Sequence, residues 1–190
     1  MNLKKYNSLP LNLEMAVTDE MQKIALDVIP NAICLVPEKR EERTTEGGLE
    51  VCKNITRLRS FLKPIKAKNI RVSLFIEPGE EQIDAAKTIG ADIIELHTGH
   101  FCDLYEENDA SYKESLKILE KAASYAYKLG LEVHAGHGLT TGSVGLVSKI
   151  PEMRELNIGH AIISDSIFLG LREAVQLMKQ KINQSRFQRT

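Results

Sequence analysis

The chain has 190 residues, of which 43% are hydrophobic and 27% are charged, so its composition is that of a globular protein rather than a disordered or fibrous one. The 25 basic and 26 acidic residues leave a formal net charge of -1, which argues against a general binder of nucleic acids or anionic membranes. No apolar run approaches the roughly 18 residues of a membrane-spanning helix, and we expect no secretory signal in the first residues.

The predicted elements alternate between short apolar strands and helices along the chain. In chain order, the patterning predicts strands over residues 11–16, 32–36, 70–76, 91–96, 131–135 and 156–163. It predicts helices over residues 20–28, 49–66, 78–89, 110–129, 144–149 and 166–181. Thr18 is a predicted N-cap, and Gly90 and Gly130 are predicted C-caps. Residues 38–48 and 97–100 are predicted loops.

This alternation favours a parallel sheet with helical crossovers, because the predicted strands are short, apolar and suited to burial on both faces. Such a sheet is either a (β/α) barrel or a doubly wound open sheet. Polar residues stand at the C-terminal tips of several predicted strands: Glu14, Glu95, His97, His137 and His160. A barrel gathers these tips around one mouth, where its active site lies. We therefore predict an α/β fold of the (β/α)8 TIM-barrel type.

The number of predicted units is smaller than a closed barrel needs. A barrel of this type has eight strand–helix units and about 250 residues, whereas the patterning predicts six units here. We therefore expect residues 1–190 to form a single barrel domain that lacks its first two units at the N-terminus. A partner chain or a swapped segment that supplies these units is the alternative.

All five histidines lie in three segments near the ends of predicted strands. The segment 131–139 closes an apolar run with His137 between Gly136 and Gly138. Glycine lets a ligand approach the backbone closely, and an unperturbed histidine titrates near working pH. The other histidines are His97, His100, His134 and His160. This clustering predicts an active-site edge at the tips of the strands.

The three cysteines, Cys34, Cys52 and Cys102, are odd in number and form no Cys-x-x-Cys pair. We therefore expect neither a disulfide scaffold nor a thiolate zinc site, and we expect a reducing cytoplasm as the location of the protein.

A resemblance to a known family rests on segments that run in order through nearly the whole chain. They are Asn-Leu-Glu-Met-Ala at 12–16, Leu-Val-Pro-Glu-Lys-Arg at 35–40, Thr-Thr-Glu-Gly-Gly at 44–48, Val-Ser-Leu-Phe-Ile at 72–76, Glu-Leu-His-Thr-Gly at 95–99, Ala-Gly-His-Gly-Leu at 135–139 and Glu-Leu-Asn-Ile-Gly-His at 155–160. By these segments the chain resembles the pyridoxine 5'-phosphate synthases of vitamin B6 biosynthesis. The resemblance implies a phosphate-binding (β/α)8 barrel that works as a homo-oligomer.

The resemblance also implies a reaction. The family condenses 3-amino-2-oxopropyl phosphate with 1-deoxy-D-xylulose 5-phosphate, and releases pyridoxine 5'-phosphate, phosphate and water. It implies no metal and no organic cofactor. Metal binding through His97 and His100, or through His134 and His137, is the alternative, but their spacing fits no helix-borne pair of ligands.

The chain departs from the family at its N-terminus. The family begins with two further strands, which end in an Asn-x-Asp-His-like and a His-Leu-Arg-Glu-Asp-x-Arg-His-like segment and supply a catalytic histidine and phosphate-binding basic residues. Neither segment is found here, so we expect a chain that is truncated relative to the family. Smaller departures are His134 and the loop Thr141-Gly142-Ser143.

The predicted catalytic residues are Glu14, Glu95 and His137. Forming the ring requires several proton transfers, so the site needs acid–base groups in different environments. Glu14 has apolar neighbours in the sequence, and desolvation would make it a usable acid or base; it matches a catalytic residue of the family. Glu95 matches a glutamate that stabilises charge, with a structural salt bridge as the alternative. His137 matches the proton donor, with a turn-fixing histidine as the alternative.

The predicted substrate-binding residues are implied by the same resemblance. Gly138 would offer its N–H to a substrate phosphate, and Gly159 and His160 lie at the tip of the last strand, where such barrels bind phosphate. Thr44 matches a residue that contacts the deoxyxylulose phosphate, in a loop long enough to be a lid. The resemblance assigns no role to His97.

Two other functions stay open at this level. The first is a different sugar-phosphate isomerase or aldolase on the same barrel, which would act on one phosphorylated substrate without the amino ketone. The second is a catalytically inactive binding or assembly subunit, because the N-terminal histidine and basic residues of the family are not found here.

Overall fold

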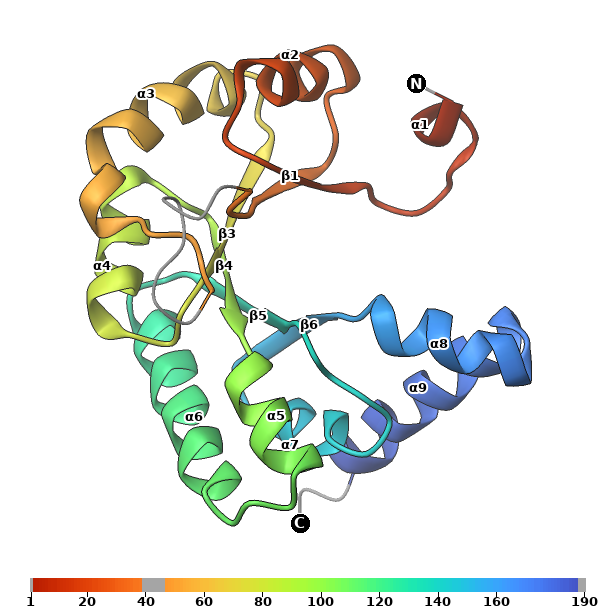
Figure 1. Cartoon of the computed structure of the whole chain (residues 1–190). Coiled ribbons are helices and arrows are strands. Elements are labelled where there is room, and N and C mark those ends of the chain that lie inside the picture. Colours follow the sequence, from red (N-terminus) through yellow and green to blue (C-terminus); the bar gives the residue numbers. More distant parts are fainter. Residues whose placement is uncertain (1, 39–46, 188–190) are drawn as a thin grey trace. The chain divides into compact units, whose positions relative to one another are not determined.

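The computed structural model of the chain describes residues 2–38 and 47–187 (Figure 1). The chain divides into two compact units, Met1–Glu95 and Leu96–Thr190. The strand β4 (Ile93–His97) begins in the first unit and ends in the second.

The first unit alternates strands and helices. Before β4, its elements in chain order are α1 (Asn2–Tyr6), β1 (Asn12–Met15), α2 (Asp19–Val28), β2 (Ala32–Leu35), the 3-10 helix η2 (Cys52–Asn54), α3 (Ile55–Lys66), β3 (Arg71–Ile76) and α4 (Glu80–Ile89). The strands lie in the order β1-β2-β3-β4, and β1, β2 and β3 pair in parallel. In a doubly wound sheet the strand order reverses, and this unit shows no such reversal. The α/β prediction is confirmed, and the sequential order is that of a (β/α) barrel.

The core of the first unit lies between its strands and the helices α3 and α4. All four residues of β2 are buried, as are Leu58, Leu62 and Ile65 on one face of α3 and Ile83 on α4. Burying a leucine or isoleucine side chain contributes roughly 1.5–3 kcal/mol each. The amphipathic patterns of these helices therefore hold them against the sheet.

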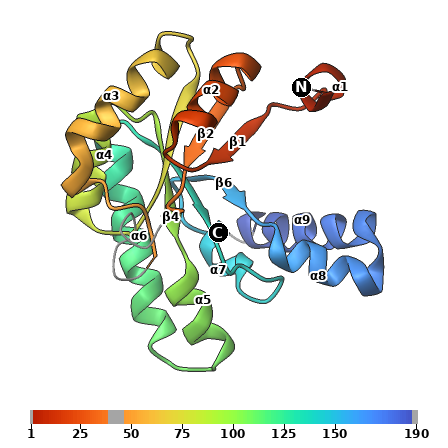
Figure 2. The ribbon, with the colours of Figure 1, turned by 45° about the horizontal axis from the view of Figure 1, so that its top comes forward.

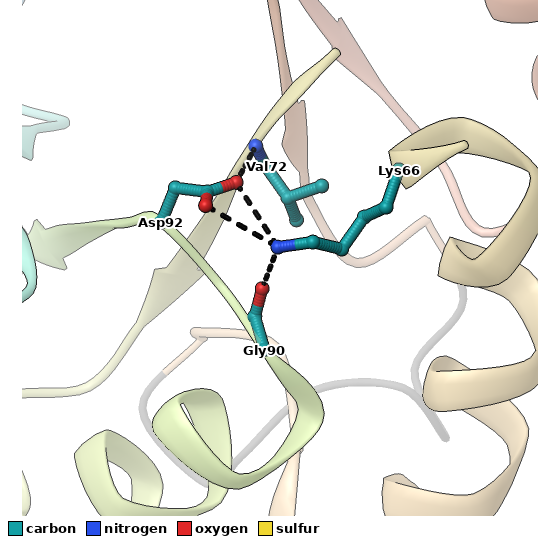
Figure 3. Close-up of polar contacts among 4 residues, drawn as sticks. All are labelled: Lys66, Val72, Gly90 and Asp92. Carbon is teal, nitrogen blue, oxygen red and sulfur yellow. Dashed lines mark hydrogen bonds and ion pairs between the residues drawn. The ribbon is translucent and has the colours of Figure 1, made fainter. Parts of the chain in front are cut away.

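Polar contacts around Asp92, just before β4, link this segment to β3 and α3 (Figure 3). The carboxylate of Asp92 accepts a hydrogen bond of 2.9 Å from the Val72 N–H of β3. The Lys66 ammonium, at the end of α3, lies 3.2 Å from the same carboxylate and donates to the Gly90 carbonyl. One lysine thus ties α3 to the turn that follows α4, where Gly90 adopts φ 85°.

The second unit continues the alternation. After β4 come α5 (Gly99–Glu106), α6 (Tyr112–Lys128), β5 (Glu132–Gly136), α7 (Val144–Ser148), β6 (Met153–Asn157), α8 (His160–Leu169) and α9 (Leu171–Phe187). The strands β5 and β6 pair in parallel, with a register shift at Val133/His134. Figure 2 shows α8 and α9 side by side. The Arg186 side chain of α9 donates to the carbonyls of Ser148 and Met153, which secures α9 against α7 and β6.

Local capping signals are confirmed in both units. The Thr18 hydroxyl accepts a hydrogen bond of 3.3 Å from the Met21 N–H at the start of α2. Gly90 follows α4 in the left-handed conformation. Gly130 has φ 76° after α6. These boundaries depend on contacts within a few residues, which the sequence displays directly.

Four predicted boundaries are wrong. The predicted loop 97–100 contains the start of α5, which packs Phe101 and Cys102 into the core. The predicted helix 49–66 begins later, at Ile55, because the Leu49 N–H donates to the Phe75 carbonyl at 2.8 Å instead. These two differences arise because tertiary contacts, rather than local propensity, decide the state of both segments.

The other two differences lie near the C-terminus. The predicted strand 156–163 is displaced, since β6 ends at Asn157 and α8 begins at His160. A short apolar run such as 161–163 suits a strand or a helix equally. The predicted last helix is interrupted at Gly170, whose φ of 83° separates α8 from α9.

The prediction that every strand is buried on both faces is confirmed for β2 and wrong for β1 and β6. Asn12 and Glu14 of β1 are exposed, and so are Arg154 and Glu155 of β6. Within the described residues, β1 pairs with β2 alone and β6 pairs with β5 alone. Across residues 2–38 and 47–187, no helix is both long and apolar enough to cross a membrane.

Candidate active site

A layer of polar side chains crosses the strands of the first unit. Glu14 of β1 is in register with Cys34 of β2, and Cys34 is in register with Ser73 of β3. The Cys34 thiol donates a hydrogen bond of 3.3 Å to the Glu95 carboxylate of β4. Side chains in register on adjacent strands lie on the same face of the sheet. The layer therefore contains two of the predicted catalytic carboxylates and the thiol between them.

The protonation of Cys34 follows from its surroundings. Burial raises the pKa of the Cys34 thiol well above its usual value, and the charges of Glu95 and Glu14 raise it further. The neighbouring Ser73 side chain lowers the pKa, but by less. The thiol is therefore protonated and is the donor in its contact with Glu95. Glu95 is only 4% exposed. A buried carboxylate without hydrogen-bond donors is costly, so the hydrogen bond from the Cys34 thiol stabilises the Glu95 carboxylate.

Glu14 corrects one sequence-based argument. The side chain is exposed, so the apolar surroundings that the sequence suggested are not present in this chain. Leu13 and Met15 flank Glu14 in the sequence, but neighbouring residues of a strand point to opposite faces of the sheet. Their apolar side chains consequently do not desolvate the Glu14 carboxylate.

In the second unit, His137 lies in an unusual backbone conformation just after β5. Its φ is 79°, and that of Gly138 is 82°. A left-handed conformation is uncommon for a residue with a Cβ atom and is found mostly at turns and functional sites. The His137 side chain is exposed, and its ring centroid lies 5.0 Å from that of His97. The two imidazoles thus form a tilted pair beside the strand tips.

Two glycines allow this pair to form. A Cβ atom on Gly99 would lie 2.6 Å from His97 Nε2 and 3.2 Å from His137 Cδ2, so a larger residue there would displace the two imidazole rings. A Cβ atom on Gly138 would lie 2.9 Å from the Cβ of Cys102 on α5. The flanking glycine that the sequence suggested for ligand access is therefore also required by packing.

Thr98 is a site residue that the sequence analysis missed. Its side chain is fully buried, and its hydroxyl lies 2.7 Å from the Gly136 carbonyl oxygen and 2.6 Å from the His137 carbonyl oxygen. The spacing of the sequence offers no signal for this contact, because the two partners are 39 residues apart.

The predicted phosphate-binding residues Gly159 and His160 lie at the N-terminus of α8. Gly159 is the N-cap and His160 is the first helical residue, and both are exposed. Backbone N–H groups at the start of a helix bind anions. The structure therefore keeps these residues available for the role that the resemblance implies.

Two further residues singled out in the sequence are Thr44 and His134. Thr44 lies outside the described residues. The chain that follows it is held at Gly48, whose N–H donates to the Glu77 carboxylate at 2.7 Å. His134 is buried with Nε2 2.8 Å from the Glu132 carboxylate and Nδ1 3.7 Å from that of Glu155. This histidine thus lies beside carboxylates of both β5 and β6.

Comparisons with known proteins identify the family. The family model of the pyridoxal phosphate biosynthesis protein PdxJ matches residues 1–184. The pyridoxine 5'-phosphate synthase of Sulfurihydrogenibium sp. (strain YO3AOP1) is 53% identical over 182 residues, which are 96% of this chain and 74% of that protein. The enzyme of the same name from Ruegeria pomeroyi is 52% identical over 180 residues, 94% of this chain and 73% of that protein. The chain therefore spans about three quarters of the length of these relatives.

Solved structures share the fold at low sequence identity. The 3-keto-L-gulonate-6-phosphate decarboxylase of Vibrio cholerae matches with a TM-score of 0.64 and 14% identity. The match spans 96% of this chain and 76% of the decarboxylase chain. The tryptophan synthase A-subunit of Pyrococcus furiosus matches with a TM-score of 0.58 and 14% identity. The match spans 96% of this chain and 68% of the A-subunit. These likenesses concern the fold alone and confirm the predicted TIM-barrel class. The family model and the two relatives establish that the chain belongs to the family of the pyridoxal phosphate biosynthesis protein PdxJ.

Proposed function

We propose that the protein is a pyridoxine 5'-phosphate synthase, a transferase of vitamin B6 biosynthesis. It condenses 3-amino-2-oxopropyl phosphate with 1-deoxy-D-xylulose 5-phosphate and releases pyridoxine 5'-phosphate, phosphate and water. The observation that carries this function is the high identity, over nearly all of the chain, to relatives that bear this name.

The proposed catalytic groups are Glu14, Glu95 and His137. Ring closure needs an imine, dehydrations and a new carbon–carbon bond, and each step moves a proton. Glu95 is a buried carboxylate held by a thiol donor, which suits a group that stabilises positive charge as it develops. Glu14 has an exposed carboxylate, available to exchange protons with a bound substrate. The exposed imidazole of His137 suits a proton donor.

The proposed phosphate-binding groups are backbone N–H groups at two places. The N–H of Gly138 follows the left-handed turn at His137, and Gly159 and His160 open α8. A helix N-terminus stabilises a phosphate through its aligned dipoles and its unsatisfied N–H groups. Thr44 completes the proposed contacts to the deoxyxylulose phosphate. As the family resemblance implies, acid–base catalysis uses no metal and no organic cofactor.

We also propose that the protein is a cytoplasmic homo-oligomer. Large apolar side chains on α8 are exposed, Ile167 to 77% and Phe168 to 87%, and exposed apolar patches mark association surfaces. The odd number of cysteines and the lack of a Cys-x-x-Cys pair suit a reducing compartment. Light scattering coupled to size-exclusion chromatography tests the oligomer.

The test of the activity uses the protein isolated from its source, after its intact mass has been compared with the 21.3 kDa of this chain. Both phosphorylated substrates are supplied, and the expected result is formation of pyridoxine 5'-phosphate with one equivalent of released phosphate. Conversion of a sugar phosphate without the amino ketone would favour an isomerase or aldolase instead. Absence of any turnover, with a folded oligomer, would favour a binding or assembly subunit.

A further inference from the structure

The backbone at His137 is held by one buried hydroxyl from another part of the second unit. The Thr98 hydroxyl lies 2.7 Å from the Gly136 carbonyl oxygen and 2.6 Å from the His137 carbonyl oxygen. The Thr98 N–H also donates to the Gly136 carbonyl at 2.9 Å. Three contacts from a single residue therefore converge on the two peptide groups that set the direction of His137.

The conformation of His137 needs such support. A residue with a Cβ atom at φ 79° is disfavoured sterically and persists where surrounding contacts over-determine it. The Cys102 thiol, on α5, is 3.7 Å from the His137 carbonyl oxygen, and a thiol is a weaker donor than a hydroxyl. The hydroxyl of Thr98 is therefore the principal donor to this carbonyl among the contacts described.

Thr98 is also placed to act without meeting a substrate. Its side chain has no exposed surface, whereas that of His137 is exposed. A hydroxyl that is buried and directed at backbone carbonyls can influence a reaction only through the groups that it holds.

We propose that Thr98 is a positioning residue for His137, because its hydroxyl donates to the His137 carbonyl while its N–H donates to the Gly136 carbonyl, and the pair of bonds keeps the imidazole where it can deliver a proton. This inference rests on the proposed function of His137 as the proton donor. Loss of the hydroxyl relaxes the turn and spreads the imidazole over several orientations. The chemical step then slows, while contacts of the substrates elsewhere persist.

The test compares Thr98→Val, which keeps the shape and removes the donor, with Thr98→Ser, which keeps the donor. Misplacement of a catalytic group by about 1 Å costs on the order of a hundredfold in rate. Thr98→Val is therefore expected to lower kcat by about tenfold to a hundredfold, with KM changed by less than about threefold. Thr98→Ser is expected to recover most of kcat. The exposed Thr88→Val, on α4, is the matched control and is expected to leave kcat unchanged.

A double-mutant cycle separates positioning from a general structural effect. In a His137→Ala background, Thr98→Val is expected to cause no further loss of kcat, since the group that it positions is gone. An equal further loss in that background would overturn the proposal. So would Thr98→Val with kcat and a pH profile equal to those of the wild-type protein.

A spectroscopic measurement keeps this inference distinct from the proposed function. The histidine ring resonances are followed through a pH titration by NMR, with those of His137 assigned by their loss in His137→Ala. Thr98→Val is expected to shift or broaden the His137 resonances, and Thr98→Ser to leave them near the wild-type positions. Unchanged resonances in Thr98→Val refute positioning, whether or not the protein turns over. If Thr98→Val does not fold, Thr98→Cys provides a similar side chain with a weak donor and is judged by the same outcomes.

Discussion

The Cys34 thiol of β2 donates a hydrogen bond of 3.3 Å to the Glu95 carboxylate of β4, and both side chains are buried. The partners are 61 residues apart in the chain. Because burial and two nearby carboxylates keep the thiol protonated, the donor is present throughout the range in which the enzyme would work. One of the proposed catalytic carboxylates therefore accepts a hydrogen bond from a cysteine outside the proposed catalytic set.

Replacing Cys34 tests this dependence. In Cys34→Ala the Glu95 carboxylate loses a buried donor, and leaving such a group less satisfied costs about 1–3 kcal/mol of unfolding free energy. Cys34→Ser restores a donor of similar size and is expected to regain most of that stability. Urea unfolding of the three proteins gives the comparison. Equal stability of the alanine and serine variants would show that the hydrogen bond contributes nothing measurable.

Cys102 gives a prediction for alkaline pH. Burial raises the pKa of its thiol from 9.0 to about 11. Because the folded pKa lies above the unfolded one, the associated stability is fully present below pH 9 and is lost as the pH rises to about 11.

The measurement is the unfolding free energy of the wild-type protein and of Cys102→Ser between pH 8 and 11. All other groups titrate in both proteins, so their contribution cancels when one free energy is subtracted from the other. The wild-type protein is expected to lose stability more steeply over this range. Parallel curves for the two proteins would contradict the raised pKa of the Cys102 thiol.

Gly48 is expected to tolerate no side chain. A Cβ atom there would lie 2.7 Å from the Glu77 backbone nitrogen and 2.9 Å from the Ile76 carbonyl carbon, so Gly48→Ala forces the backbone apart. The expected loss is about 1–3 kcal/mol of unfolding free energy, together with a higher KM for the deoxyxylulose phosphate because Gly48 follows the proposed substrate contact Thr44 closely in the sequence.

Gly79→Ala is the matched control for Gly48. A Cβ atom at Gly79 meets no atom within 4 Å, and alanine at this N-cap position of α4 costs roughly 0.5–1 kcal/mol relative to glycine. Thermal unfolding followed by circular dichroism compares the two variants. A Gly48→Ala protein as stable as Gly79→Ala would refute the close contact.

His137→Ala tests the proposed proton donor. The side chain is exposed and alanine keeps the Cβ atom at this left-handed position, so the substitution is expected to change the unfolding free energy by about 1 kcal/mol or less. Loss of a positioned acid is expected to lower kcat by about a hundredfold to ten-thousandfold. Steady-state kinetics with both substrates, beside a folding control, provides the measurement. Turnover close to that of the wild-type protein would remove His137 from the mechanism.

Local signals in the sequence determined much of the fold. The alternation of apolar strands with helices predicted an α/β barrel, and Thr18 and Gly90 marked helix boundaries that the structure confirms. These signals are readable because hydrophobic periodicity and caps depend on residues within one or two turns of each other. The family resemblance, carried by short segments, was readable for the same reason and is confirmed by the comparisons.

Only the tertiary structure decided the contacts that organise the candidate site. The Cys34–Glu95 hydrogen bond and the Thr98–His137 clamp join residues 61 and 39 positions apart, and no local pattern encodes such distances. The exposure of Glu14 and the start of α5 at Gly99 likewise depend on which elements pack beside them. Residue types in a sequence thus indicated the chemistry, whereas packing between distant segments set the surroundings in which each group works.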